Sequence, residues 1–231
     1  MRLWVNDRKL FPDPLQTPPD GVVAVSDDIP LEALLESYSF GIFPWPHKDT
    51  PVLWFCPEER GVLDFKDFHI SKSLKKFQRQ TQYTVTFNQN FEQVIKNCAR
   101  VHRPGQADTW ITDNMREKYL EFHQNGYAHS VECWMDGELV GGMYGVYVAG
   151  VFSGESMFFN KSNASKLCII HLVEVLKQNG LNWMDVQMVT DVVRSMGGKY
   201  IDRRQFLNRL EYSKRSARPL VFPKVIVNQA E

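Results

Sequence analysis

Residues 128–166 read AHSVECWMDGELVGGMYGVYVAGVFSGESMFFNKSNASK, and this stretch decides the fold. Ser130–Met135 alternates as a strand does, and Asp136-Gly137 is a strong signal for a two-residue hairpin turn. Two further runs, Glu138–Val148 and Val151–Phe158, predict the second and third strands. The stretch therefore predicts a meander of three consecutive strands.

The same stretch carries glycines, a carboxylate and a cap at informative positions. Gly141 and Gly142 stand inside the second strand, where glycine usually marks a bulge or a close approach of a ligand or another backbone. Glu155 stands in an otherwise apolar strand, and because an unpaired buried carboxylate is costly, we expect it to have a partner or a role. Asn163 is predicted to cap a helix over Ala164–Asn179 that is apolar nearly all round. Three consecutive strands followed by such a helix predict half of an acyltransferase-like α+β core.

The composition favours a folded chain with a full apolar core. With 231 residues, of which 43% are hydrophobic, the chain suits one large domain or one domain plus a small one. Its start, MRLWVNDRKL, lacks the apolar run of a secretory signal, and no apolar stretch approaches the roughly 20 residues of a membrane span. The four scattered cysteines favour reduced thiols in or near the core over a metal site or a disulfide. We therefore expect a cytoplasmic protein with no membrane contact and no metal ion.

The formal net charge of zero conceals a segregation of charge along the chain. Basic residues prevail in segments 66–100 and 199–224, and acidic residues prevail in segments 1–65 and 101–198. Two basic patches on a neutral protein could bind a polyanion locally. They could equally be solvated faces, and charge alone leaves both interpretations open.

The beginning of the chain predicts a small separate unit. Pro30 opens a helix, and the run Gly41–Pro46 that follows it is too rigid and aromatic for an ordinary surface loop. A strongly basic helix then begins after the predicted cap Ser71. We place the domain boundary between the two, so that residues 1–60 form a small N-terminal α/β domain and residues 61–231 form the larger domain.

Generic catalytic motifs do not match this sequence. It contains no P-loop, no GxSxG, no HExxH and no dinucleotide fingerprint. What remains is Glu155 together with Asp185 and Gln187, which a strand over Trp183–Gln187 would place on one face. A carboxylate at that spacing can orient an amide by accepting its N–H. The alternative is that both side chains simply bond to nearby loops.

Eight motifs, in order along the chain, resemble those of one known family. They are FGIFPW (Phe40–Trp45), HISKSLKK (His69–Lys76), TWIT (Thr109–Thr112), AHSVE (Ala128–Glu132), GELVGGMYGV (Gly137–Val146), FSGESMF (Phe152–Phe158), NASK (Asn163–Lys166) and DVQ (Asp185–Gln187). The chain resembles the leucyl/phenylalanyl-tRNA–protein transferases from about Tyr38 to Arg204. The resemblance implies an α+β fold, with a small N-terminal domain packed on an acetyltransferase-like (GNAT-type) domain whose mixed, mostly antiparallel sheet is flanked by helices.

The resemblance also implies a reaction and its partners. The family transfers Leu or Phe, with Met as a further donor, from aminoacyl-tRNA to the N-terminal Lys or Arg of acceptor proteins. The product carries a destabilising N-terminus that the bacterial N-end-rule degradation machinery reads. Because an aminoacyl ester is already activated, its aminolysis requires no metal or redox cofactor. We expect the chain to act as a monomer without a cofactor.

By the same resemblance, three polar residues carry the chemistry. Gln187 is expected to contact the attacking α-amino group and Asp185 to position and polarise it. Because a neutral amide is a very weak base, Gln187 is an orienter and a member of the proton path. Glu155 is expected to face the acceptor, where its charge suits a cationic side chain or the α-ammonium group.

The resemblance assigns three sets of binding contacts. The terminal adenine of the tRNA is expected to stack on Trp110, in a pocket framed by Trp45, Tyr38 and Tyr119. The aminoacyl side chain is expected in an apolar slot walled by Met143, Phe152, Leu172 and Leu176. The tRNA phosphates are expected to meet the basic helix at Lys72, Lys75, Lys76 and Arg79.

Two other classes of protein could share these features. An acetyl-CoA-dependent N-acetyltransferase would need a glycine-rich pyrophosphate loop before the helix at Ala164, and the run Phe158–Asn163 contains no glycine. A non-catalytic module that binds RNA or degradation signals would keep Trp110 and the basic helix but would not need Asp185 or Gln187.

Overall fold

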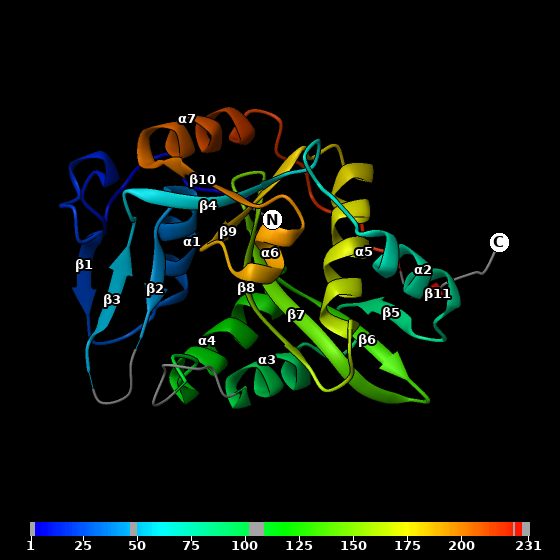
Figure 1. Ribbon diagram of the computed structural model, residues 1–231. Helices are drawn as coiled ribbons and strands as arrows, with labels where there is room; N and C mark the ends of the chain where they lie inside the picture. The colour runs from blue at the N-terminus through cyan, green and yellow to red at the C-terminus, as the bar shows by residue number, and fades with distance from the viewer. Residues whose placement is uncertain (1–2, 47–49, 102–108, 224, 228–231) are drawn as a thin grey trace.

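The computed structural model describes residues 3–46, 50–101, 109–223 and 225–227. A three-stranded sheet stands beside an eight-stranded sheet, and helices lie against the larger one (Figure 1). The predicted α+β class and the mixed, mostly antiparallel sheet flanked by helices are confirmed.

The small sheet is built from the N-terminal part of the chain. Its strands run antiparallel in the order β1 (Val22–Ser26), β3 (Val52–Phe55) and β2 (Phe43–Trp45). Between β1 and β2 lies α1 (Leu31–Ser39), with Pro30 at its N-cap. Gly41, at φ 74°, ends the helix in the left-handed conformation that glycine adopts readily.

The large sheet contains one parallel pair, at its centre. Its strand order is β10 (Lys199–Asp202), β4 (Glu59–Asp64), β9 (Trp183–Gln187), β8 (Val151–Phe159), β7 (Glu138–Val148), β6 (Ala128–Met135), β5 (Thr84–Phe87) and β11 (Val225–Val227). Neighbours are antiparallel except β8 and β9, which are parallel. The helix α5 (Ala164–Gln178) makes the crossover between them, as a parallel pair requires. The predicted meander and the helix that follows it are confirmed.

Both faces of the large sheet are covered. On one face lie α3 (Phe91–Arg100) and α4 (Asp113–Gln124), and on the other lies α5. Along β7, Met143 and Tyr147 join the apolar cluster of α5, whereas Tyr144 and Val146 join that of α3 and α4. The remaining helices are α2 (Lys72–Gln80), α6 (Asp191–Ser195) and α7 (Arg203–Lys214); α7 lies against β10 and β4 (Figure 1).

The two glycines of β7 mark close approaches, as predicted. A Cβ atom at Gly141 would lie 2.5 Å from the Cβ atom of Ala164, the first residue of α5. A Cβ atom at Gly142 would lie 3.2 Å from Val94 on α3. The two positions therefore let helices on opposite faces of the sheet approach one strand.

The start of α5 differs from the prediction in one respect. Asn163 is at the N-cap, but its side chain makes no capping hydrogen bond. Its backbone is left-handed, with φ 65°, a conformation that asparagine tolerates better than most residues. Asn163 therefore serves the turn that leads into the helix, and the prediction of side-chain capping is wrong.

The small sheet and the large one share a buried core. Trp54 of β3 and Tyr144 of β7 belong to one apolar cluster, and β4 already begins at Glu59. Arg203 of α7 adds a polar connection, because it donates hydrogen bonds to the carbonyl oxygens of Thr17 and Pro57. The domain boundary at residue 60 stays a prediction.

Candidate active site

A cavity of about 410 Å³ opens between the small sheet and the centre of the large one. β8 and β9 pair at Ser153 and Asp185, and the residues that follow on both strands line the cavity. β2, α5 and α6 supply the other walls, in the middle of the molecule in Figure 1. The lining residues are Phe43, Pro44, Trp45, Leu63, Trp110, Met143, Gly154, Glu155, Ser156, Met157, Ile169, Met184, Val186, Gln187, Met188, Thr190, Val193 and Met196.

Aromatic rings form one wall of the cavity. The ring centroids of Trp45 and Trp110 lie 6.5 Å apart at an interplanar angle of 60°. Phe55 supports Trp45 edge-on, with centroids 5.8 Å apart. Trp110 is only half-buried, so part of its ring is accessible. The structure brings these two predicted tryptophans together.

Flexible apolar side chains also line the cavity. Five methionines line the cavity: Met143, Met157, Met184, Met188 and Met196. Of the four residues expected to form the aminoacyl slot, Met143 lies there, whereas Phe152, Leu172 and Leu176 are fully buried and are not among its lining residues. The residue of α5 that lines the cavity is Ile169, which lies about one helical turn before Leu172.

Two β-bulges, one in β8 and one in β9, orient the polar side chains of the site. In the pairing of β8 with β7, Tyr144 is opposite Ser156 and Gly145 is opposite Gly154, so Glu155 is the extra residue. In the pairing of β9 with β4, Asp185 and Gln187 are opposite consecutive residues, so Val186 is the extra one. A bulge breaks the simple alternation of a strand and re-aims its side chains.

The bulge separates two residues that simple alternation would place on one face. Gln187 lines the cavity, whereas Asp185 is 1% exposed and lies beneath it. Gln187 has φ 58°, and the N–H group of Met188 donates to the carbonyl oxygen of Val186 at 2.5 Å. A positive φ inside such a three-residue turn is uncommon for a side chain as long as glutamine, and it indicates local strain.

A buried ion pair holds this turn in place. Asp185 accepts hydrogen bonds from Arg60 Nε at 2.9 Å and from Arg60 Nη2 at 2.7 Å. The same carboxylate accepts from the backbone N–H of Gln187 at 2.9 Å and from the hydroxyl of Ser153 at 3.0 Å. Asp185 therefore positions Gln187 through the backbone, and the expected contact with the side-chain amide is not seen.

Arg60 is the site residue that the sequence did not reveal. It is 1% exposed and stands between the rings of Phe43 and Phe206, 4.5 Å from each centroid. Burial opposes its charge, but Asp185 outweighs burial and raises the pKa of Arg60. Its Nη1 group donates to the carbonyl oxygen of Gly41 at 3.1 Å. Arg60 thus connects the small sheet to β9, and no local pattern distinguishes it from a surface arginine.

Glu155 forms the polar centre of the cavity wall. Its Oε1 atom accepts hydrogen bonds from Tyr38 and from the side-chain amide of Gln187, both at 2.8 Å. Burial raises the pKa of Glu155 to about 8, against the lowering effect of the bond from Tyr38. The prediction that Glu155 has partners is confirmed. Since its pKa lies above neutrality, Glu155 does not carry the permanent negative charge that the sequence suggested.

Tyr38 and Tyr119 lie behind Glu155 instead of framing the cavity. Their hydroxyl oxygens are 2.5 Å apart, and both side chains are buried. Burial and the nearby Glu155 raise the pKa of each phenol well above its usual value. The two tyrosines therefore contribute neutral hydroxyl groups to the carboxyl side of the site.

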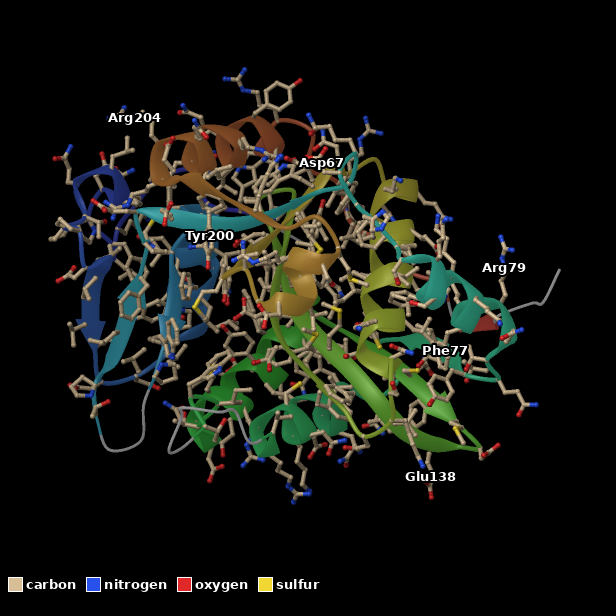
Figure 2. The ribbon with its side chains drawn as sticks, in the orientation of Figure 1. Asp67, Phe77, Arg79, Glu138, Tyr200 and Arg204 are labelled. Atoms are coloured by element: carbon tan, nitrogen blue, oxygen red, sulfur yellow. The ribbon has the colours of Figure 1, made fainter. Side chains whose placement is uncertain are left out.

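The two basic segments behave differently. Lys72, Lys75, Lys76 and Arg79 are exposed on α2, beyond α5 from the cavity, and Arg79 projects outward in Figure 2. In the second segment, Lys199 and Arg209 bond to Asp64, and Arg209 also stacks on Trp183. Arg204 does point outward (Figure 2). Two cations of the second segment are thus paired with Asp64, and α2 is the more exposed basic surface.

Among the described residues, no group of His, Cys, Asp and Glu could hold a metal ion, and the four cysteines are buried and form no disulfide. The predicted core position of the cysteines is confirmed. Within the same ranges, none of the helices has both the length and the apolar character of a membrane span.

An apolar cavity beside the parallel pair of β8 and β9, with two tryptophans and a bonded carboxyl–amide pair in its wall, is compatible with an acyl-transfer site. A family model described as leucyl/phenylalanyl-tRNA protein transferase matches residues 62–211, and the model of its N-terminal domain matches residues 27–58. The chain belongs to the leucyl/phenylalanyl-tRNA protein transferase family, an aminoacyltransferase family, and the predicted resemblance is confirmed.

Two relatives of known name agree with this assignment. The chain is 45% identical over 203 residues to a leucyl/phenylalanyl-tRNA–protein transferase of Maridesulfovibrio salexigens, covering 87% of this chain and 85% of the relative. It is 46% identical over 214 residues to the protein of the same name from Pseudoalteromonas atlantica, covering 91% of each. A solved GCN5-related N-acetyltransferase-like protein from Streptococcus suis aligns with a TM-score of 0.36 and 13% identity, covering 63% of this chain and 60% of the other.

Proposed function

We propose that this chain transfers Leu or Phe, and Met as a further donor, from aminoacyl-tRNA to the α-amino group of proteins that begin with Lys or Arg. The ester bond to the tRNA is exchanged for a peptide bond. The new N-terminal residue marks the acceptor for degradation by the N-end rule.

The observation that carries this proposal is the bonded pair of Glu155 and Gln187 in an otherwise apolar cavity. An aminoacyl ester and an amine react once they are aligned, and alignment can contribute roughly 7–11 kcal/mol of the barrier. Polar groups fixed beside an apolar slot supply that alignment. Family membership supports the nature of the two substrates.

We assign Gln187 to the attacking α-amino group and Glu155 to the acceptor end. Asp185 acts on the substrate only through Gln187. Its carboxylate accepts a hydrogen bond from the backbone N–H of Gln187 and so fixes the turn that orients the side-chain amide. A cation that enters beside Glu155 would favour the ionised carboxyl group. This supports a preference for acceptors that begin with Lys or Arg.

The methionine wall suits the aminoacyl side chain. Met143 and Ile169 face the cavity, whereas Phe152, Leu172 and Leu176 pack behind it and act on its shape through the core. Methionine side chains adapt to different apolar shapes. Because an apolar pocket rejects a one-methylene difference by only about 1–3 kcal/mol, we expect several apolar amino acids to be transferred at unequal rates.

One assay tests the proposal against its rivals. The purified protein is incubated with labelled Leu-tRNA or Phe-tRNA and with peptides that begin with Arg or with Ala. Label on the Arg peptide alone supports the transferase. Transfer from acetyl-CoA would identify an N-acetyltransferase, which is disfavoured because the N-terminus of α5 packs on β7 at Gly141. Binding of tRNA without transfer would identify a non-catalytic module.

Trp110 is expected to hold the donor by stacking on its terminal adenine. Stacking of a base on an aromatic ring is worth roughly 1–3 kcal/mol, so Trp110→Ala should raise the Kd for aminoacyl-tRNA about 5- to 150-fold. Turnover at saturating donor should change much less. Binding is measured with the non-reacting amide analogue of the charged tRNA. Trp134→Ala, on β6 outside the cavity, is the matched control, and an equal loss of affinity there would reject the stacking role.

The basic surface of α2 is expected to bind tRNA phosphates. Replacing its four outward cations by alanine should weaken tRNA binding and flatten its salt dependence, by about 0.9 in the slope of log K against log salt for each lost contact with duplex. The residues are Lys72, Lys75, Lys76 and Arg79. A control variant removes four cations from other surfaces, namely Lys66, Lys96, Lys161 and Lys177. Equal slopes for the two variants would show that only overall charge matters.

A further inference from the structure

The carboxyl group of Glu155 is hydrogen-bonded on one oxygen and bare on the other. Its Oε1 atom accepts from Tyr38 and Gln187. Its Oε2 atom is shielded from solvent and has no hydrogen-bond partner among the described residues. The residue as a whole is only half-buried and lines the cavity. A buried polar atom without a partner at a cavity wall indicates a ligand group that binds there.

The hydrogen bonds around Glu155 have a defined direction. Tyr38 has one hydroxyl proton and donates it to Oε1 of Glu155, so Tyr119 must be the donor in the bond between the two tyrosines. Gln187 also donates to Oε1. Since two donors occupy Oε1, a proton on this carboxyl group belongs on Oε2, the oxygen without a protein partner.

We infer that Glu155 is the proton acceptor of the reaction: its Oε2 atom takes the proton from the α-ammonium group of the acceptor, while Tyr38 and Gln187 hold the carboxyl group in place. The inference rests on the proposed function and deepens it. It identifies the base and gives the two buried tyrosines a role as positioning residues.

The proton balance is as follows. The carboxylate of Glu155 takes one proton from the α-ammonium group and leaves a neutral amine. The amine nitrogen attacks the ester carbonyl carbon, so a C–N bond forms and the C–O bond to the tRNA ribose breaks. The second proton lost by the nitrogen goes to the departing ribose oxygen. The proton on Glu155 is released to solvent after the product leaves.

The surroundings of Glu155 match this role. Burial raises the pKa of the carboxyl group to about 8, and Asp185 raises it further while Tyr38, Arg60 and Gln187 lower it. An α-amino group has a pKa of about 7.7–8.0, so the proton would move between groups of nearly equal affinity. An ordinary glutamate, with a pKa of 4.5, would hold the proton about 3 × 10³-fold less well.

The neighbouring polar groups are less suitable as bases. Asp185 has both oxygens engaged by Arg60 and does not line the cavity. Gln187 is a neutral amide. Tyr38 on α1 and Tyr119 on α4 have pKa values well above their usual range and stay protonated. Of the titratable groups that face this point, Glu155 is the one that can take a proton near neutral pH.

Glu155→Gln tests the inference directly. At saturating acceptor, kcat should fall by about 10²-fold or more, the usual contribution of a positioned base, while tRNA binding is retained. Glu132→Gln is the control, because it replaces a fully buried carboxyl group on β6 whose oxygens accept hydrogen bonds from Thr86 and Ser130 and which does not line the cavity. A rise in KM for the acceptor with kcat intact would mean that Glu155 only binds the acceptor.

Tyr38→Phe supplies a second test. It should shift the pH dependence of kcat only if Glu155 is the base, and not if Glu155 has a purely structural role. The bond from Tyr38 lowers the pKa of Glu155, so its removal should raise that pKa further. Because the ionised carboxylate is the active form, the rise of kcat with pH should move to higher pH. An unmoved pH profile in a folded variant would overturn the inference. Wild-type protein that transfers no amino acid would instead reject the proposed function.

A stability measurement checks the same carboxyl group without substrates. The folded pKa of Glu155 is about 8 against an ordinary 4.5, so the folded state holds the proton more tightly. Its contribution to stability is therefore present at low pH and is lost as pH rises from about 4.5 to about 8. Glu155→Gln should lose less stability across this window than the wild type. If stability changed equally with pH in the wild type and in Glu155→Gln, the pKa of Glu155 would be ordinary, and Glu155 would be rejected as the base.

Discussion

Replacing Asp185 with alanine is expected to lower turnover strongly and to destabilise the protein by about 3–5 kcal/mol. The stability loss follows because Arg60 would remain charged and buried without its partner. Turnover should fall by about 10²-fold or more, because the N–H group of Gln187 would lose its acceptor and the strained turn would relax. Chemical denaturation and single-turnover transfer from Leu-tRNA measure the two effects.

A double variant separates folding from catalysis. Arg60→Met combined with Asp185→Val removes both charges, and apolar replacements of a buried ion pair are often neutral or stabilising. The double variant should regain about 2 kcal/mol of the stability lost in Asp185→Ala. It should not regain turnover, because Gln187 still lacks its carboxylate. If turnover returned with stability, Asp185 would act on the fold alone.

Gly61→Val is expected to cost turnover with a smaller loss of stability. A Cβ atom at Gly61 would lie 3.0 Å from the carbonyl carbon of Met188 and 3.1 Å from the carbonyl group of Gln187. A branched side chain there would push the turn towards the cavity. A displacement of about 1 Å can cost 10²-fold in rate, whereas overpacking typically costs about 1–3 kcal/mol of stability. The measurements are kcat at saturating substrates and the free energy of unfolding.

Gly180→Asn is the matched control for this variant. Gly180 follows the C-terminal end of α5 and has φ 83°, and a Cβ atom built on it would meet nothing within 4 Å. Asparagine tolerates that conformation, so kcat should stay within about twofold of the wild type. Full activity in Gly61→Val would show that the bulge in β9 does not control the reaction.

Local patterns predicted most of the elements. The Asp136-Gly137 turn fixes a hairpin because both residues take positive φ, at 52° and 79°. The predicted cap Ser71 accepts a backbone N–H at the start of α2, as its short polar side chain favours. Asn90 and Thr112 do the same at the starts of α3 and α4. These features depend on a few consecutive residues, so the sequence contains all the information they need.

The candidate site was predictable in part. The sequence singled out Glu155, Asp185 and Gln187 as polar residues in apolar strands, and the structure brings them into one hydrogen-bonded network. Their individual contacts were not predictable, because the bulges at Glu155 and Val186 depend on register with the neighbouring strands. Their roles in catalysis stay proposals.

The sequence by itself determined the meander and its crossover helix, the family, and the cavity-facing residues Trp45, Trp110 and Met143. Only the tertiary structure decided that Arg60 neutralises Asp185 and that Tyr38 bonds to Glu155, contacts that join residues 125 and 117 positions apart. Periodicity and caps are local, whereas the desolvation and pairing of a charge depend on which distant groups the fold brings around it.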